Sequence, residues 1–137
     1  MQKLTKRFAL ILAVVIISLG SLSAVEIKKI HFLIPGGAGG GWDGTARGTG
    51  EALTKAGLIV SATYENMSGG GGGKAIGYLI ENSKSNHGTL MVNSTPIVIR
   101  SLTKVFPQNF RDLTLIAGTI GDYAALVVPA GSSYGNF

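Results

Sequence analysis

Short apolar runs alternate along the chain with longer segments in which apolar residues recur at helical spacing. The first run, over 27–34, sets isoleucine and phenylalanine among lysine and histidine, and it predicts a strand that Pro35 ends. Residues 59–65 and 89–93 contain β-branched residues and predict two more strands of the same kind.

Three helices are predicted between and after these strands. Residues 45–56 place small or apolar residues every three or four positions, and Gly57 suits the position just past a helix end. A second helix is predicted after Gly73, where an apolar stripe begins. A third is predicted to start with Thr95 as its N-cap and Pro96 at the first helical position.

The first predicted helix combines a weak interior with a strong start. Gly48 and Gly50 each cost on the order of 1 kcal/mol relative to alanine, so this helix needs tertiary packing to persist. Asp43 precedes it, and aspartate is a preferred N-cap residue. We therefore expect Asp43 to cap the helix, a role compatible with holding a water or a ligand hydroxyl.

Alternating strands and helices predict an α/β fold with a mainly parallel sheet flanked by helices. Apolar runs at 113–117 and 124–128 predict later strands, whose pairing the sequence does not determine. In a parallel sheet the strand-to-helix loops gather at the carboxyl ends of the strands, where ligands usually bind. We expect this topology to bring together the loops 36–43, 66–73 and 94–95.

Two of these loops are dominated by glycine, at 36–43 and again at 68–74. Glycine lacks a Cβ atom, so its backbone can approach a bound group closely and can adopt positive φ. The free amides and the dipole of the following helix favour negative charge. Both loops are therefore predicted to hold a small anion with main-chain atoms.

A flexible, low-complexity linker is the alternative interpretation of the same glycines. Trp42, Asp43, Asn66 and Lys74 argue against it, because an indole among glycines provides an apolar wall for a ligand. Arg47 and Lys74 could add positive charge near an anion, although solvent exposure is the usual state of such side chains.

The first 24 residues are predicted to be an export signal. A basic start precedes an apolar stretch over 8–19, and small residues at 21–24 suit cleavage after Ala24. A retained membrane anchor is the alternative, but the apolar stretch is shorter than the roughly 20 residues that a spanning helix needs. Without this segment nine basic residues face seven acidic ones, a net charge of +2.

Composition excludes several classes of function. The chain has no cysteine, which excludes disulfides, thiolate metal sites and a cysteine nucleophile. The basic residues form no cluster with aromatic residues, so we expect no nucleic-acid partner. His31 and His87 have no evident serine or carboxylate partner, and no G-x-S-x-G motif occurs, so we expect neither an enzyme nor a metal site.

Two nucleotide-binding motifs fit the glycine loops poorly. A Walker A loop requires glycine at the position of Ser68 and serine or threonine at that of Ala75. The dinucleotide fingerprint G-x-G-x-x-G matches Gly39 to Gly44, with Glu65 as the residue that would bind a ribose hydroxyl. That match is weak in a glycine-rich stretch, but a dehydrogenase-like dinucleotide-binding domain remains an alternative.

Several motifs together resemble a known family of binding proteins. They are, in order, Pro35-Gly36-Gly37 followed by glycines with Asp43 and Arg47, Glu65-Asn66 before the second glycine cluster, His87-Gly88-Thr89-Leu90, and Val127-Val128-Pro129. This order resembles the periplasmic substrate-binding proteins of tripartite tricarboxylate transporters, the Bug family. The resemblance spans the chain after the export signal.

The resemblance implies a two-lobed fold of the type II periplasmic-binding-protein class, of which this chain is a truncated form. Residues 25–122 would be the N-terminal ligand-binding lobe, and 123–137 the crossing strand and the start of a second lobe that is largely missing. His87 departs from the family's usual aspartate, and the added glycine and Trp42 of the first loop depart as well.

The resemblance also implies the residues of the site. Backbone amides of the two glycine loops would hold one carboxylate, Ser94 and Thr95 would add side-chain contacts, and Tyr123 would lie near the crossing between lobes. The implied ligand-binding residues are Gly36, Gly37, Ala38, Gly39, Gly40, Gly41, Trp42, Asp43, Asn66, Ser68, Gly69, Gly70, Gly71, Gly72, Ser94, Thr95 and Tyr123.

The implied function is capture of a small organic di- or tricarboxylate in the periplasm and its delivery to the membrane subunits of the transporter. Such a protein is not an enzyme, acts as a monomer and needs no cofactor. A receptor that presents its bound ligand to a membrane sensor would use the same site and stays an alternative.

Overall fold

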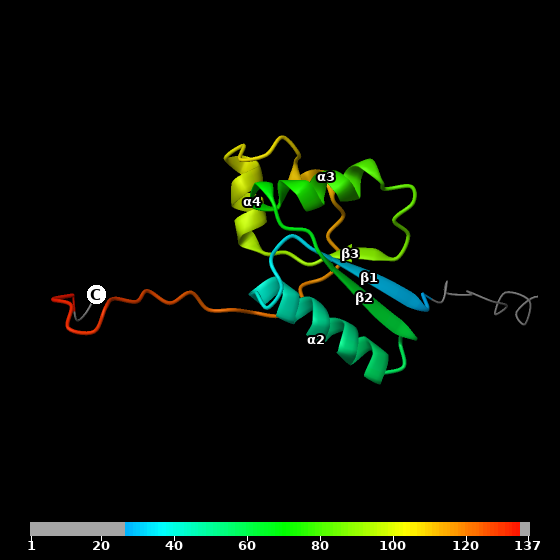
Figure 1. Ribbon diagram of the computed structural model, residues 1–137, viewed down its shortest axis with the longest axis horizontal. Coiled ribbons are helices and arrows are strands. Elements are labelled where there is room, and N and C mark those ends of the chain that lie inside the picture. The colour runs from blue at the N-terminus through cyan, green and yellow to red at the C-terminus, as the bar shows by residue number, and fades with distance from the viewer. Residues whose placement is uncertain (1–26, 135–137) are drawn as a thin grey trace, which may run out of the picture.

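The computed structural model describes residues 27–134, and the export signal predicted for 1–24 lies outside them. The elements run in the order β1 (Lys29–Ile34), α2 (Gly41–Lys55), β2 (Ser61–Asn66), the 3-10 helix η1 (Gly70–Gly72), α3 (Gly73–Glu81), β3 (Thr89–Met91), α4 (Thr95–Leu102) and the 3-10 helix η2 (Phe110–Asp112) (Figure 1). No helix among the described residues is both long and apolar enough to cross a membrane.

The three strands form one parallel sheet with the order β2-β1-β3. Phe32 of the central strand stands opposite Tyr64 on one side and Leu90 on the other. Phe32, Leu33 and Ile34 are almost completely buried, because helices cover both faces of the strand. The predicted α/β fold with a parallel sheet is confirmed.

The helices form two layers, with α2 on one face of the sheet and α3 and α4 on the other (Figure 1). Phe32 and Ile34 pack with Ala46 of α2 in one hydrophobic cluster. Residues Ile76 and Ile97, from α3 and α4, form the second cluster with Phe106. Trp42 packs against both clusters, so it joins the two layers at the edge of the sheet.

The strand order creates a topological switch point. The chain passes from β1 to β2 through α2, then returns through α3 on the opposite face to reach β3. Right-handed crossovers that run in opposite directions place their helices on opposite faces. The helices that follow the neighbouring strands β1 and β3 therefore diverge, and a crevice outside the strand ends is the usual ligand site of such sheets.

Two predicted helix starts were wrong. Helix α2 begins at Gly41 with Gly40 as its N-cap, so Asp43 lies inside the first turn and is not the cap. Helix α4 begins at Thr95 with the extended Ser94 as its N-cap. A carboxylate in the first turn can reach back to an amide ahead of the helix. An aspartate near the start of a predicted helix therefore fits either the N-cap position or the first turn.

The strands predicted at 113–117 and 124–128 are also absent from the structure. Residues 114–129 form an extended chain without a strand. It passes α2 at Thr119 and Ile120 and then runs away from the rest of the fold (orange to red in Figure 1). Leu115 is 90% exposed and Val127 82% exposed. Strand propensity reflects packing on a half-buried sheet, and no neighbouring strand pairs with this segment among the described residues.

Gly50 marks the closest approach of α2 to the sheet. A Cβ atom there would overlap the hydroxyl of Tyr64 and lie 2.8 Å from Cβ of Ala62 and 3.0 Å from Cε2 of Phe32. At Gly48, which is on the same helix, an added Cβ would meet nothing within 4 Å. The two helix-weakening glycines therefore differ, since only Gly50 is required by packing.

We expect Gly50→Ala to lower the free energy of unfolding by about 1–3 kcal/mol through overpacking. Gly48→Ala should instead raise it by up to about 1 kcal/mol, because alanine is the better helix former. Urea denaturation of both variants measures the difference. Equal shifts of the same sign would show that the helix does not depend on this close contact.

Candidate functional site

Hydrogen bonds join the three loops at the carboxyl edge of the sheet, as the topology predicted. The side-chain amide of Asn66, at the end of β2, donates to the carbonyl of Gly36 at 3.1 Å. The indole Nε1 of Trp42 donates to Oγ of Ser94 at 2.9 Å, across the switch point between β1 and β3. The first loop thus contacts both of its neighbours.

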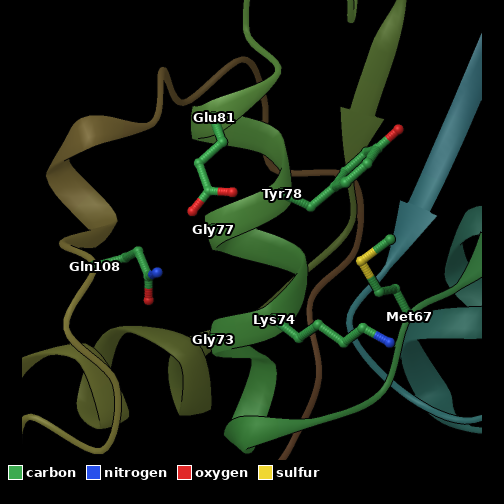
Figure 2. Close-up of a pocket in the computed structure, with 7 residues that line it drawn as sticks. All are labelled: Met67, Gly73, Lys74, Gly77, Tyr78, Glu81 and Gln108. Atoms are coloured by element: carbon green, nitrogen blue, oxygen red, sulfur yellow. The ribbon is translucent and has the colours of Figure 1, made fainter.

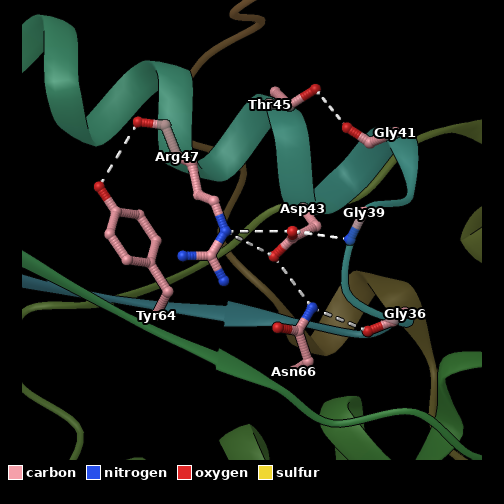
Figure 3. Close-up of polar contacts among 8 residues, drawn as sticks. All are labelled: Gly36, Gly39, Gly41, Asp43, Thr45, Arg47, Tyr64 and Asn66. Carbon is pink, nitrogen blue, oxygen red and sulfur yellow. Dashed lines mark hydrogen bonds and ion pairs between the residues drawn. The ribbon is translucent and has the colours of Figure 1, made fainter.

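Asp43 holds the first loop in shape (Figure 3). Its side chain is buried, and its carboxylate accepts hydrogen bonds from the amide of Gly39 at 2.9 Å, from Nε of Arg47 at 3.1 Å and from Nδ2 of Asn66 at 3.1 Å. Asp43 and Asn66 therefore brace the loops against each other. Their direct contact with a ligand stays a prediction.

The same hydrogen bonds keep the carboxylate of Asp43 ionised. Hydrogen bonding by Arg47, followed by that of the Gly39 amide, lowers the pKa of Asp43 from its ordinary 3.8 to about 2. The Arg47 guanidinium lies between this carboxylate and the ring of Tyr64, 4.9 Å from the ring centroid. Arg47 is thus neutralised within the fold and does not supply the free positive charge that the sequence suggested.

The first loop leaves a stretch of backbone open. A Cβ atom added at Gly37, Gly39 or Gly41 would meet nothing within 4 Å. The amides of Gly39 and Gly40 bond to Asp43 and to the Gly37 carbonyl. Within the described structure the amides of Gly37, Ala38 and Gly41 have no protein acceptor, so they remain available to an anion.

The second loop has an unusual backbone. Four consecutive glycines have positive φ, at 140° for Gly69, 56° for Gly70, 64° for Gly71 and 103° for Gly72. The carbonyl of Gly69 accepts from the amides of Gly72 and Lys74, at 3.0 and 3.5 Å. Two amides near the start of α3 therefore turn toward the protein's own backbone.

Packing explains most of the glycines in the second loop. A Cβ atom at Gly72 would overlap Cδ1 of Ile97, and one at Gly71 would lie 3.1 Å from Cδ of Arg100. Only at Gly70 of η1 would an added Cβ atom meet nothing within 4 Å, and there the positive φ favours glycine. This loop is therefore mainly a packing element, and the first loop offers the more open surface.

The remaining predicted site residues differ in position. Ser94 bonds to Trp42 at the crevice, and Thr95 is exposed beside it at the start of α4. Tyr123 is 97% exposed on the extended segment and is not brought to the loops. Of the predicted residues, all but Tyr123 thus lie at one edge of the sheet.

Arg100 is a site residue that the sequence did not reveal. Its Nη1 donates to the carbonyl of Gly71 at 3.2 Å, so it lies at the second loop. Arg100 follows Ile97 by three positions on α4, and residues at that spacing share a helix face. Once Ile97 is known to pack on the second loop, this spacing predicts that Arg100 lies at the same loop.

A shallow groove of about 320 Å³ runs along α3 next to the second loop. Figure 2 shows Lys74 and Met67 on one side of the helix and Gln108 with Glu81 on the other. The two glycines in its wall, Gly73 and Gly77, complete the lining with Tyr78. No group of three or more histidine, aspartate or glutamate side chains that could hold a metal occurs in the described range.

The expectation that His31 has no carboxylate partner was wrong. Its Nδ1 lies 2.8 Å from Oγ1 of Thr63, and its Nε2 lies 3.4 Å from a carboxylate oxygen of Glu65. The parallel register sets His31 opposite Thr63, and Glu65 follows on the same face. The carboxylate that the dinucleotide alternative assigned to a ribose thus contacts a histidine in the sheet.

Comparison of the chain with protein-family models, with curated proteins and with solved structures found no match. What the loops can bind is therefore inferred from their geometry and chemistry.

We expect the stability of the protein to fall as the pH drops from about 5 toward 2, as Asp43 becomes protonated. The sign follows from the lowered pKa of Asp43. Ionised Asp43 stabilises the fold at any pH above the pKa it has in the unfolded chain, and this stabilisation is lost as the pH falls through the lower pKa it has in the folded protein. Asp43→Asn should be less stable at neutral pH and should show a flatter profile in urea denaturation.

Asp122→Asn is the matched control, because Asp122 lies on the exposed extended segment. It should leave the pH profile unchanged. Parallel profiles for the wild type and Asp43→Asn would contradict the assigned role of the buried carboxylate.

Proposed function

We propose that this chain is the first ligand-binding lobe of an exported solute-binding protein that captures a small organic di- or tricarboxylate. The observation that carries the proposal is the open main-chain surface of the first loop at the switch point between β1 and β3. The amides of Gly37, Ala38 and Gly41 lie there without a protein acceptor in the described part of the chain.

Backbone amides at a helix start suit a carboxylate for two reasons. They donate hydrogen bonds to its oxygens, and the partial positive charge of the helix end favours its negative charge. Helix α2 has 15 residues and begins at this loop. The ring of Trp42 lies against Gly36 and adds an apolar surface to this loop, which favours an organic acid over a bare inorganic ion.

The charges around the loops support an anionic ligand. Arg47 is paired with Asp43, but no carboxylate pairs with Lys74 or Arg100 among residues 27–134. Both unpaired side chains lie at the second loop. An acidic ligand at the second loop would therefore meet two positive side chains that no carboxylate of the described residues neutralises.

The proposed mechanism is hinge closure of a type II periplasmic-binding fold. This lobe would capture one carboxylate with its amides, and a second lobe would close over the rest of the ligand. The protein would reach the periplasm through its N-terminal signal, act as a monomer without catalysis, and deliver the acid to the membrane subunits of a tripartite tricarboxylate-type transporter. The resemblance of the loop motifs supports this proposal.

The strand order argues against the dinucleotide-binding alternative. Dinucleotide-binding sheets place the third strand beside the second, in the order 3-2-1-4, whereas here β3 pairs with β1. Glu65 also contacts His31, as described above. A receptor that presents the bound acid to a membrane sensor would use the proposed site unchanged, and capture of transporter subunits would distinguish the two.

Gly37→Ala tests the proposal directly, because the added methyl group meets nothing in the protein and φ at this position is not positive. We expect it to reduce affinity for an organic acid at least about tenfold by blocking the approach to the amides, a loss of about 1.4 kcal/mol. Calorimetry with citrate, succinate and glucose, together with the fluorescence of the single tryptophan, provides the measurement.

Gly48→Ala is the control, since it adds the same methyl group to an open position away from the loops. It should bind like the wild type. Binding of glucose in preference to the acids, or equal affinity of Gly37→Ala and the wild type, would refute the proposed use of the first loop.

A further inference from the structure

Arg100 is the cationic side chain that the fold fixes at the glycine loops. It lies on α4, is partly buried, and its Nη1 donates to the carbonyl of Gly71 at 3.2 Å. Its Cδ fills the space that Gly71 leaves by lacking a side chain, where a Cβ atom would lie 3.1 Å away. Val105 packs at the same place, 3.3 Å from that Cβ position. The guanidinium is thus held by packing as well as by a hydrogen bond.

Most of the hydrogen-bonding capacity of this guanidinium is unused. Arginine has five N–H donors and stays charged at any ordinary pH. Arg100 makes one side-chain hydrogen bond, and none of the acidic residues in the described part of the chain pairs with it. A partly buried charge without a counter-ion is unfavourable, so the position favours binding of an anion from solution.

The loop contacts connect this arginine to the first loop. Gly72 follows Gly71, and a Cβ atom at Gly72 would lie 3.7 Å from Cβ of Pro35, where the first loop begins. Gly72 also contacts Ile97, which is one helical turn before Arg100 on α4. Arg100 and the start of the first loop therefore flank the same pair of glycines, Gly71 and Gly72.

We propose that Arg100 binds a carboxylate of the ligand and is the residue that selects acids with more than one carboxylate. This inference rests on the proposed function and adds to it a side chain that recognises a second carboxylate of the ligand. The planar fork of the guanidinium matches a carboxylate with two parallel hydrogen bonds. The first-loop amides hold one carboxylate and Arg100 a second, so a monocarboxylate gains from only one of the two contacts.

Arg100→Gln tests the inference, with Arg111→Gln as its matched control. Arg111 lies on η2, with its guanidinium 4.5 Å from the centroid of the Phe110 ring, and it makes no contact with the loops that we identify. Titration of the full chain with citrate, succinate and acetate at low and high salt provides the affinities. Thermal unfolding of each variant shows whether the fold is retained.

We expect Arg100→Gln to weaken citrate and succinate about tenfold or more, to leave acetate unchanged, and to reduce the salt dependence of citrate binding. Arg111→Gln should bind all three acids like the wild type. Arg100→Lys keeps the charge without the planar fork and should bind citrate with intermediate affinity. If Arg100→Gln destabilises the fold, the affinities of Arg100→Lys for the three acids provide the test instead.

The outcomes separate this inference from the proposed function. If the wild type binds the acids and a folded Arg100→Gln variant binds them equally, the role of Arg100 is refuted and the proposed function stands. An equal loss for citrate, succinate and acetate would show that Arg100 only supports the loop, which also refutes selection by charge. If the wild type binds none of the acids, the proposed function fails and the role of Arg100 fails with it.

Discussion

The buried carboxylate of Asp43 is the interaction on which the candidate site depends. It draws a loop amide, a guanidinium from its own helix and the side-chain amide of Asn66 to one point. These bonds set the curve of the first loop and attach it to the neighbouring strand. The amides that they leave unused, at Gly37 and Ala38, are therefore fixed in place before any ligand arrives, which lowers the ordering cost of binding.

Local patterns predicted the first half of the fold because they report local physics. The apolar run at 32–34 is continuous since this end of β1 is buried on both faces. Gly57 follows the end of α2 with the expected positive φ of 70°. Strand order depends on contacts between distant segments and could not be predicted. The failure at 113–117 and 124–128 has the same cause, because strand propensity requires a partner.

Glycine composition predicted where the candidate loops lie but not the role of each glycine. Gly71 and Gly72 are needed for side chains of α4 to approach, whereas Gly37 has open space above its Cα atom. These cases look identical in a sequence, because the absent Cβ atom serves packing and ligand access equally. The sequence did not predict the position of Arg100 either, because that position depends on how α4 packs on the second loop.

The extended segment over 114–129 has a practical consequence for work in solution. Its exposed leucine, isoleucine and valine side chains combine strand propensity with few charges, and the sheet has open edges at β2 and β3. Segments of this kind add to free sheet edges of other molecules and seed aggregation. Samples should therefore be kept dilute and cold and be monitored by light scattering. Fusion of a soluble carrier protein after this segment would shield it.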